Sequence, residues 1–415
     1  MREMKDSGIE WVGTIPQDWQ LSKIGNLYTQ RNEKVSDKDY QPLSVTMQGI
    51  LPQLATAAKT DDGDNRKLVR VGDFAINSRS DRRGSCGISP LDGSVSLINI
   101  ILTPRTAMHP GYYNWLFHTT LFADEFYKWG HGIVADLWTT RWQEMKSITV
   151  PVPEYAEQER IAAFLDAECA EIDAVLEKTR ASIEEYKKLK QAVITQAVTK
   201  GVRGDRPMKD SGIEWIGEIP AEWDVLNLVA HTSMLTPMRD RPENLDGPIP
   251  WVRIEDFEGK YIESSKAGLG VSMKTVKEMN LKVYPVGTIL CTSSCIMGKC
   301  AIVSRELVSN QRFIGIIPDR TTDKTYLYYL MTSNAERMNF LSTGALQANL
   351  SRSAFEHLKV QFPPYSEQQE IVAYLDDKCE KIDALIARKQ QYLTEIENYK
   401  KSLIYEYVTG KKEVV

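Results

Sequence analysis

Basic side chains gather between residues 66 and 85, in the segment RKLVRVGDFAINSRSDRRGS. The cations of this segment are Arg66, Lys67, Arg70, Arg79, Arg82 and Arg83. Only two carboxylates, Asp73 and Asp81, oppose them. Lysine and arginine contact phosphates, and arginine can donate two hydrogen bonds to guanine O6 and N7. The segment therefore predicts a nucleic-acid surface. The simpler alternative is a solvated loop in which pairs such as Asp81 with Arg83 neutralise each other.

The side chains that could reach base edges lie at the end of this segment. Arg79, Arg82 or Arg83 could read guanine. Their smaller polar partners would be Asn77, Ser78 and Ser80. A second short segment, LWTTRW (137–142), adds Thr139, Thr140 and Arg141 between tryptophans. Tryptophans in such a setting belong more often to the core than to a DNA-stacking surface.

Catalytic chemistry has no comparable signal. FPPY (362–365) resembles the Asn-or-Asp-Pro-Pro-Tyr motif of adenine-N6 methyltransferases, but phenylalanine cannot accept hydrogen bonds from an amino group. A related segment, PVPEY (151–155), has no such motif, so the prolines are better explained as a rigid junction before a helix. We find no glycine-rich phosphate loop of the G-x-G-x-x-G or G-x-x-x-x-G-K-[ST] kind. We therefore expect no catalytic residue and no cofactor on this chain.

The six cysteines do not form a disulfide framework over 415 residues, so we expect reduced thiols. Cys291, Cys295 and Cys300 are close enough to suggest zinc, but no histidine lies nearby and a fourth ligand is not evident. We therefore expect no metal site. Cys169 and Cys379 fall in helical segments, where a small buried hydrophobe is the favoured role.

The elements that must position these groups occur twice. MKDSGIEWVGTIPQDW (4–19) reappears as MKDSGIEWIGEIPAEW (208–223), and EQERIAAFLDAECAEIDAVLEK (157–178) reappears as EQQEIVAYLDDKCEKIDALIAR (367–388). The sequence between these anchors diverges. A tandem duplication with variable inserts predicts one scaffold that presents two different recognition surfaces. The tryptophans of the first motif are expected to pin the start of each insert against the helices; they are Trp11, Trp19, Trp215 and Trp223.

The inserts read as versions of one mixed α and β fold with short strands. VRVGDFAIN (69–77) matches YPVGTILCT (284–292), and both run apolar before a polar loop. Gly72 matches Gly287, and Gly84 matches Gly298. The second insert is less basic at the matching loop, so its expected DNA contacts are dispersed. They are Arg253, Ser293, Lys299, Arg312, Asn349 and Arg352.

Each EQ segment opens a long helix with one apolar stripe. The stripe recurs at steps of three and four residues, typical of a coiled coil. In the first helix it contains Leu165, Ile172, Leu176, Ile183 and Tyr186. In the second it contains Leu375, Ile382, Ile386, Leu393 and Ile396. A stripe this long cannot be buried alone, so the two helices are expected to pack antiparallel and to relate the inserts by a pseudo-two-fold axis. A plain dimerisation stalk is the alternative.

These observations predict an α+β protein with two globular recognition domains separated by two long antiparallel coiled-coil helices. The expected segments are 1–156 and 202–366 for the domains, and 157–201 and 367–415 for the helical regions. The net charge of -5 and pI near 5.8 argue against a protein that coats nucleic acid over its whole surface. No apolar run reaches the length of a membrane span, and MREMKDSG lacks the apolar region of a secretory signal. We expect a cytoplasmic protein without a membrane partner.

The order of variable domain, helix, variable domain and helix resembles the DNA-specificity (S) subunit of type I restriction-modification enzymes. The resemblance covers nearly the whole chain and rests on DSGIEW-x-G-x-IP-x-x-W before each domain and P-x-x-EQ before each helix. GIVADL (132–137) and GALQANL (344–350) also resemble the end of a target recognition domain in that family. The first lacks the Gln and Asn of the second, which indicates two different recognition types.

The resemblance implies a non-catalytic subunit whose two domains each read one half of a bipartite, asymmetric DNA site. It implies that the helices fix the spacer and bind two methyltransferase subunits, to which two restriction subunits can be added. S-adenosylmethionine, ATP and magnesium would then belong to the partner subunits. The whole complex would be a type I site-specific deoxyribonuclease. The alternatives from the residues themselves are a sequence-specific DNA-binding regulator and a coiled-coil assembly protein.

Overall fold

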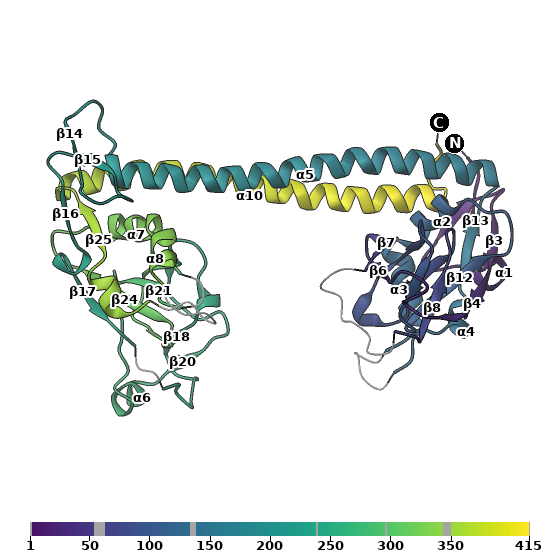
Figure 1. The fold of residues 1–415 in the computed structure, drawn as a ribbon, viewed down its shortest axis with the longest axis horizontal. Helices are drawn as coiled ribbons and strands as arrows, with labels where there is room; N and C mark the ends of the chain where they lie inside the picture. Colours follow the sequence, from purple (N-terminus) through teal and green to yellow (C-terminus); the bar gives the residue numbers. More distant parts are fainter. Residues whose placement is uncertain are drawn as a thin grey trace. The chain divides into compact units, whose positions relative to one another are not determined.

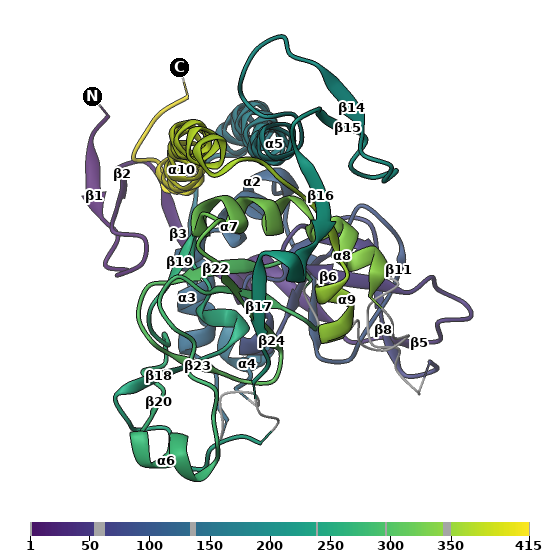
Figure 2. The ribbon, with the colours of Figure 1, turned by 90° about the vertical axis from the view of Figure 1, so that its left-hand side faces the viewer.

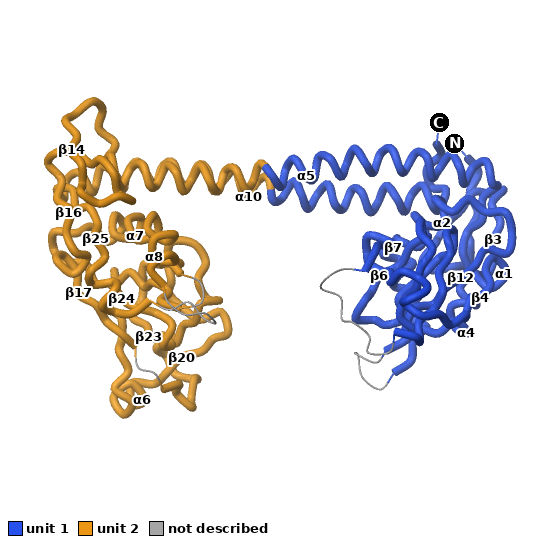
Figure 3. The backbone as a smooth tube through the Cα atoms, viewed as in Figure 1, with its two compact units in different colours: residues 1–181, 390–415 blue, residues 182–389 orange. Residues whose placement is uncertain are grey.

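The computed structural model describes residues 2–53, 63–132, 138–237, 240–294, 297–342 and 350–414. The chain forms two compact units: unit 1 comprises residues 1–181 and 390–415, and unit 2 comprises residues 182–389 (Figure 3). The division runs through two long helices, α5 (Tyr155–Lys200) and α10 (Tyr365–Val408). Each unit therefore holds one globular domain, called here domain 1 or domain 2, with the helix segments next to it. The four predicted segment boundaries stay a prediction.

Domain 1 is built on a four-stranded antiparallel sheet of order β10-β9-β12-β4. Its strands are β4 (Tyr28–Arg31), β9 (Phe74–Asn77), β10 (Cys86–Ile88) and β12 (Asn99–Pro104). Alternate residues of β9 face opposite sides: Phe74 and Ile76 pack with helices α2 (Pro110–Phe117) and α3 (Thr120–Lys128), and Ala75 packs with a second layer of strands. That second layer contains β5 (Lys34–Val35), β6 (Leu43–Thr46), β7 (Gly49–Pro52), β8 (Arg66–Val69) and β11 (Gly93–Val95).

Domain 2 repeats this plan in a five-stranded sheet of order β17-β24-β21-β22-β19. Its strands are β17 (Thr232–Leu235), β19 (Tyr261–Ile262), β21 (Ile289–Thr292), β22 (Cys300–Val303) and β24 (Phe313–Pro318). Helix α7 (Lys324–Ser333) lies between this sheet and the long helices of unit 2, and α8 (Ala335–Leu341) follows it (Figures 1 and 2). The outer elements are β18 (Ile249–Val252), β20 (Gly270–Val271), β23 (Val308–Ser309) and α6 (Met273–Glu278).

The matched glycines have a common backbone requirement. Gly84 and Gly298 have φ values of 76° and 75°, in the left-handed region that favours glycine. Each lies in the turn that joins two paired strands, β9 to β10 in domain 1 and β21 to β22 in domain 2. The matching of these positions in the sequence therefore reflects one hairpin built twice.

The first and last strands of each domain pair with each other, so the chain enters and leaves at one place. In domain 1, β3 (Gln20–Lys23) pairs with β13 (Thr149–Val152); in domain 2, β16 (Asp224–Asn227) pairs with β25 (Lys359–Phe362). A hairpin precedes each first strand. These hairpins are β1 (Met4–Asp6) with β2 (Thr14–Pro16), and β14 (Met208–Asp210) with β15 (Glu218–Pro220). The short helices α1 (Ile24–Leu27), α4 (Trp142–Met145) and α9 (Arg352–Glu356) complete the domains.

The EQ motif ties each domain to its helix. The Trp19 indole donates a hydrogen bond to Glu157 at 2.9 Å, and the Trp223 indole donates to Glu367 at 3.0 Å. Arg2 also pairs with Glu157. The glutamines beside these glutamates contribute as well: Gln158 accepts a hydrogen bond from the backbone of His109, and Gln368 from that of Asp323. The expectation that tryptophans pin each domain to a helix is therefore confirmed for Trp19 and Trp223.

The other two motif tryptophans make different contacts. Trp11 packs against Phe122 of α3, with ring centroids 5.9 Å apart. Trp215 is 42% exposed and stacks with the guanidinium of Arg337, 3.8 Å from its ring centroid. The expectation was wrong for Trp215, which lies at the hairpin turn and meets α8 instead of the long helices. Trp11 belongs to the same buried cluster as Leu403 and Val408 of α10.

The coiled-coil prediction is confirmed within each unit. Leu165, Leu176, Ile183, Leu375 and Ile382 are buried, and Ile172, Tyr186, Ile386, Leu393 and Ile396 are partly buried. In unit 1, Lys400 pairs with Asp173 at 2.6 Å and Arg180 with Glu397 at 2.8 Å. Residues later in α5 thus pair with residues earlier in α10, so the two helix segments are antiparallel. In unit 2, Lys190 pairs with Asp383 at 2.6 Å, and Arg203 with Glu370 at 2.8 Å, in the same sense.

Two further properties concern the described residues alone. None of their helices is long and apolar enough to cross a membrane. Five cysteines are described, and all are buried free thiols. Cys291 and Cys300 face each other across β21 and β22 with their Sγ atoms 2.6 Å apart, and Cys295 lies outside the described residues.

Candidate nucleic-acid interface

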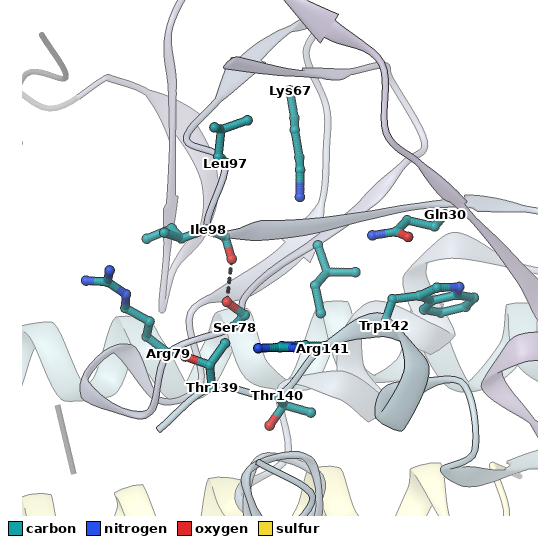
Figure 4. A pocket seen from close by; sticks show the side chains of 11 residues that line it. Gln30, Lys67, Ser78, Arg79, Leu97, Ile98, Thr139, Thr140, Arg141 and Trp142 are labelled. Carbon is teal, nitrogen blue, oxygen red and sulfur yellow. Dashed lines mark hydrogen bonds between the residues drawn. The ribbon is translucent and has the colours of Figure 1, made fainter. Parts of the chain in front are cut away.

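A cavity of about 350 Å³ opens at the end of β9 in domain 1 (Figure 4). Two of the predicted segments line it, through Ser78 and Arg79 from the first and Thr139, Thr140 and Arg141 from the second. The other lining residues are Gln30, Lys67, Leu97, Ile98, Ile100 and Trp142. Segments that the sequence predicted separately therefore form one site.

Backbone hydrogen bonds hold the two segments together. Thr140 N donates to Ser78 O at 3.0 Å, Ser80 N donates to Trp138 O at 3.1 Å, and Arg79 and Thr139 form an isolated β-bridge. The segment that contains Thr140 is also bound to α3, because the Thr140 hydroxyl donates to Phe126 O at 2.8 Å. The site is therefore a rigid edge of the domain on which side chains are presented.

Three of the eleven lining residues are cations, and none is an aspartate or glutamate. Arg79 and Arg141 are exposed, and their guanidinium groups have no hydrogen-bond or ion-pair partner among the described residues. Lys67 reaches in from β8 and donates to Asn99 O at 2.7 Å (Figure 4). Partial burial lowers the pKa of Lys67 because the charged ammonium is poorly solvated there. The cavity thus offers positive charge without an internal counter-charge.

Four predicted contact residues of domain 1 are buried, and their contact role stays a prediction. Arg66 is 4% exposed, and its guanidinium donates to the hydroxyl of Ser94 at 2.8 Å. Asn77 accepts a hydrogen bond from Arg79 N, Ser78 donates to Ile98 O at 2.5 Å, and Thr140 has no exposed surface. Their hydrogen bonds hold the end of β9 and the segment beside it in place.

The remaining predicted arginines of this region are paired; Arg82 and Arg83 are exposed, and Arg70 is partly exposed. Arg70 pairs with Asp92 at 2.7 Å, and Arg82 lies 3.8 Å from Asp81. Arg83 pairs with Asp124 of α3, so the suggested pair of Asp81 with Arg83 is wrong. The sequence placed Asp81 near both arginines, but α3 supplies the carboxylate that Arg83 meets. Ser80 is partly buried at the same turn.

In domain 2 the predicted contacts are spread over several elements. Ser293 is 9% exposed, and Lys299 donates weakly to Ile254 O at 3.4 Å. Arg253 pairs with Glu255 at 3.0 Å, and Arg352 with Glu356 at 2.7 Å. Arg312 is exposed, and its guanidinium has no partner among the described residues. Asn349 lies outside the described residues, as does most of GIVADL and of GALQANL.

The sequence reasoning missed Gln30, Ile98 and Trp142. Gln30 lies on β4 and reaches the site only because β4 pairs with β12, with Gln30 opposite Leu102. No local pattern marks such a residue. A strand-by-strand comparison of the two copies could have found Gln30. The first strand of each sheet lies beside the equivalent strand, β4 beside β12 in domain 1 and β17 beside β24 in domain 2.

Comparison with known proteins points to one family. A family model described as a type I restriction modification DNA specificity domain matches residues 224–398. The MjaIX specificity subunit of a type I restriction enzyme from Methanocaldococcus jannaschii is 35% identical over 176 residues, which cover 40% of each chain. The MjaVIII specificity subunit of the same organism is 22% identical over 434 residues, covering 96% of this chain and 94% of the relative. For MjaIX and the putative MjaX specificity subunit, the chain spans 40% and 61% of the relative's length.

Solved structures share the fold over nearly the whole chain. A chain from work on complex assembly and conformational transition of the type I R-M system matches with a TM-score of 0.75 at 14% identity, covering 96% of this chain and 99% of that one. The HsdS subunit of Thermoanaerobacter tengcongensis matches with a TM-score of 0.50 at 15% identity, covering 96% and 98%. With its two duplicated domains and its two long helices, the chain is similar in sequence to type I restriction-modification DNA-specificity subunits and shares the fold of these solved structures.

Proposed function

We propose that this chain is the non-catalytic DNA-specificity subunit of a type I restriction-modification complex. Domain 1 and domain 2 each bind one half of a bipartite, asymmetric DNA site, and α5 and α10 set the number of unspecified bases between the halves. The observation that carries the proposal is one sheet built twice, with different side chains at the corresponding edges. Two different readers on one scaffold fit a site with two different halves.

Domain 1 is proposed to meet DNA at the cavity beside β9. Its cations are uncompensated, so their charge is available to phosphates and base edges. Arg82 lies one turn away with its side chain 69% exposed and only a loose pair to Asp81, which suits a phosphate contact. Domain 2 is proposed to use Arg312 and the loop that follows β21.

Methyltransferase subunits are proposed to bind the exposed apolar edge of the helices. In unit 1, Val175 of α5 and Tyr392 and Tyr399 of α10 are 38%, 45% and 54% exposed. Val175 and Tyr392 each precede a seam residue by one position, and Tyr399 lies seven residues after Tyr392 on the same edge. The interhelix pair Arg180 with Glu397 lies on the other edge of the seam. One edge is therefore closed by charge pairing, and the other leaves apolar surface for a partner.

The partners proposed for the assembled complex are double-stranded DNA, two methyltransferase subunits and optionally two restriction subunits. S-adenosylmethionine, ATP and magnesium are assigned to those subunits. A cytoplasmic location is proposed as well, and the five described free thiols support a reducing compartment.

The test is modification-sensitive long-read sequencing of DNA from cells that express the cognate methyltransferase with or without this chain. The expected result is N6-methyladenine that appears only with the chain, at two short specific halves separated by a fixed number of free bases. An assembled complex that produces no new methylation would contradict the proposal. It would favour the alternative of a DNA-binding regulator or an assembly protein.

A further inference from the structure

The ends of β9 and β21 are equivalent positions in the two domains. Ser78 N donates to Ile98 O at 3.3 Å, and Ser293 N donates to Arg312 O at 2.8 Å. Each serine directly follows its strand. The hydrogen bonds therefore align Ser78 with Ser293, and Ile98 with Arg312. The residues that directly follow the two serines, Arg79 and Ser294, are therefore equivalent as well.

The segments that return to these serines are equivalent too. Thr140 N donates to Ser78 O at 3.0 Å, and Leu350 N donates to Ser293 O at 2.9 Å. The following residues are Arg141 and Ser351, and each stands directly before a short helix, α4 in domain 1 and α9 in domain 2. Two independent chain features thus align Arg141 with Ser351.

Three edge positions follow from this alignment, and the two domains fill them in opposite ways. Domain 1 carries Arg79, Ile98 and Arg141, all of which line its cavity. Domain 2 carries Ser294, Arg312 and Ser351. Where one domain has arginine the other has serine or isoleucine, and all three arginines are exposed without a side-chain partner among the described residues.

From this arrangement we infer that the three equivalent edge positions are the base-reading positions of both domains. Arg79 and Arg141 read guanines in the half-site of domain 1, and Arg312 reads a guanine in the half-site of domain 2. An arginine fork matches guanine O6 and N7, whereas a serine hydroxyl donates or accepts and discriminates weakly. The inference rests on the proposed function, because it assigns the contacts through which each half-site would be recognised.

The test exchanges each arginine for the residue at the equivalent position of the other domain, in the assembled methyltransferase complex. Arg79→Ser or Arg141→Ser should relax one guanine position of one half-site, lowering discrimination there about ten- to hundredfold. Arg312→Ile should relax one guanine position of the other half-site. Each variant leaves the half-site of the other domain as an internal control, read by the same sequencing.

Two matched variants separate base reading from general charge. Arg82→Ser removes a cation next to the cavity, and Arg320→Ser removes an exposed cation beyond the far end of β24. Arg82→Ser, at a proposed phosphate contact, should lower methylation uniformly without changing the recognised motif, and Arg320→Ser should change neither. Arg141→Lys keeps the charge but loses the fork, so it should relax the guanine while methylation persists.

Three results would overturn the inference: an unchanged motif in the exchanged variants, relaxation at a position without guanine, and a uniform fall in methylation with the motif intact. The last would assign these arginines to phosphates. Absence of chain-dependent methylation by the unaltered complex would instead contradict the proposed function itself, and the two failures are therefore distinguishable.

Discussion

At the residue scale, the decisive property of each arginine is the partner that the fold provides. Arg66 and Arg79 lie in one basic segment and look equivalent in sequence. Arg66 is buried against Ser94, while Arg79 projects from the end of β9 without a counter-charge. A cation that already satisfies a carbonyl or a carboxylate loses much of that interaction when it moves to DNA. We therefore expect the arginines without such a partner to be the better base readers.

Lys67 is expected to make DNA binding sensitive to pH. Burial lowers its pKa from an ordinary value near 10.5, so its charge is present below the lowered pKa and is lost as pH rises through it. We expect affinity for a target duplex to fall as pH rises, before the pH reaches the ordinary lysine value. The Lys67→Arg variant should keep its affinity to higher pH than the unaltered protein, because arginine stays protonated. Fluorescence anisotropy at constant salt checks this, and parallel pH curves for both proteins would speak against it.

The duplicated tryptophans allow a matched stability test. Trp223→Phe removes the indole donor from Glu367, whose side chain has no exposed surface, so the carboxylate loses a buried partner. We expect the free energy of unfolding to fall by about 1–3 kcal/mol. Trp215→Phe changes an exposed residue and should cost less than about 0.5 kcal/mol. Denaturant unfolding measures the stability of both variants. Equal losses would refute the assigned role of the hydrogen bond between Trp223 and Glu367.

At the element scale, neighbouring residues of one helix have separate tasks. Leu176 is 4% exposed in the seam, and Val175 beside it is 38% exposed on the apolar edge. The period of three and four residues places one of them inside and the other outside. Burial stabilises the helix pair, and exposure leaves surface for a partner.

Substitutions at these two positions should therefore separate stability from assembly. Leu176→Ala should lower the free energy of unfolding by about 2–5 kcal/mol through the cavity that it leaves. Val175→Glu should change stability by less than about 0.5 kcal/mol but abolish capture of the methyltransferase, as should Tyr399→Glu. Size-exclusion chromatography of mixed subunits gives the second readout. Normal assembly of both glutamate variants would rule out this edge as the binding surface.

At the scale of the whole molecule, helix length is expected to control target spacing. Seven residues inserted after Arg180 in α5 and seven after Ile396 in α10 preserve the seam, because these positions face each other through Arg180 and Glu397. Each insertion adds about 10 Å of helix, close to the rise of three base pairs. We expect both half-sites to stay the same while the spacer lengthens by about three bases.

Sequencing of the methylated motif reports that spacing directly. Insertion into α5 alone breaks the register between the helices and should prevent assembly, which serves as the control. An unchanged spacer in the doubly extended complex would show that the helices do not set the distance between the half-sites.

Much of this protein was decided by the sequence on its own, because the relevant signals are local or repeated. The duplicated motifs predicted two domains of one fold, and the three-and-four period of apolar residues predicted α5, α10 and their seam, Leu165 and Leu375 included. The glutamates of the EQ motif were visible as a repeat, although their partner tryptophans became clear only in the fold.

Only the tertiary structure decided which side chains form a site. Arg79 and Arg141 are far apart in the chain and meet because Thr140 bonds to Ser78 at the end of β9. The pairing of Arg83 with Asp124 and the burial of Arg66 likewise depend on elements distant in sequence. Periodicity reports which face of an element is buried, but the partner of an individual polar group depends on long-range packing. That packing leaves Arg79 and Arg141 exposed, buries Arg66 and pairs Arg83 with a carboxylate.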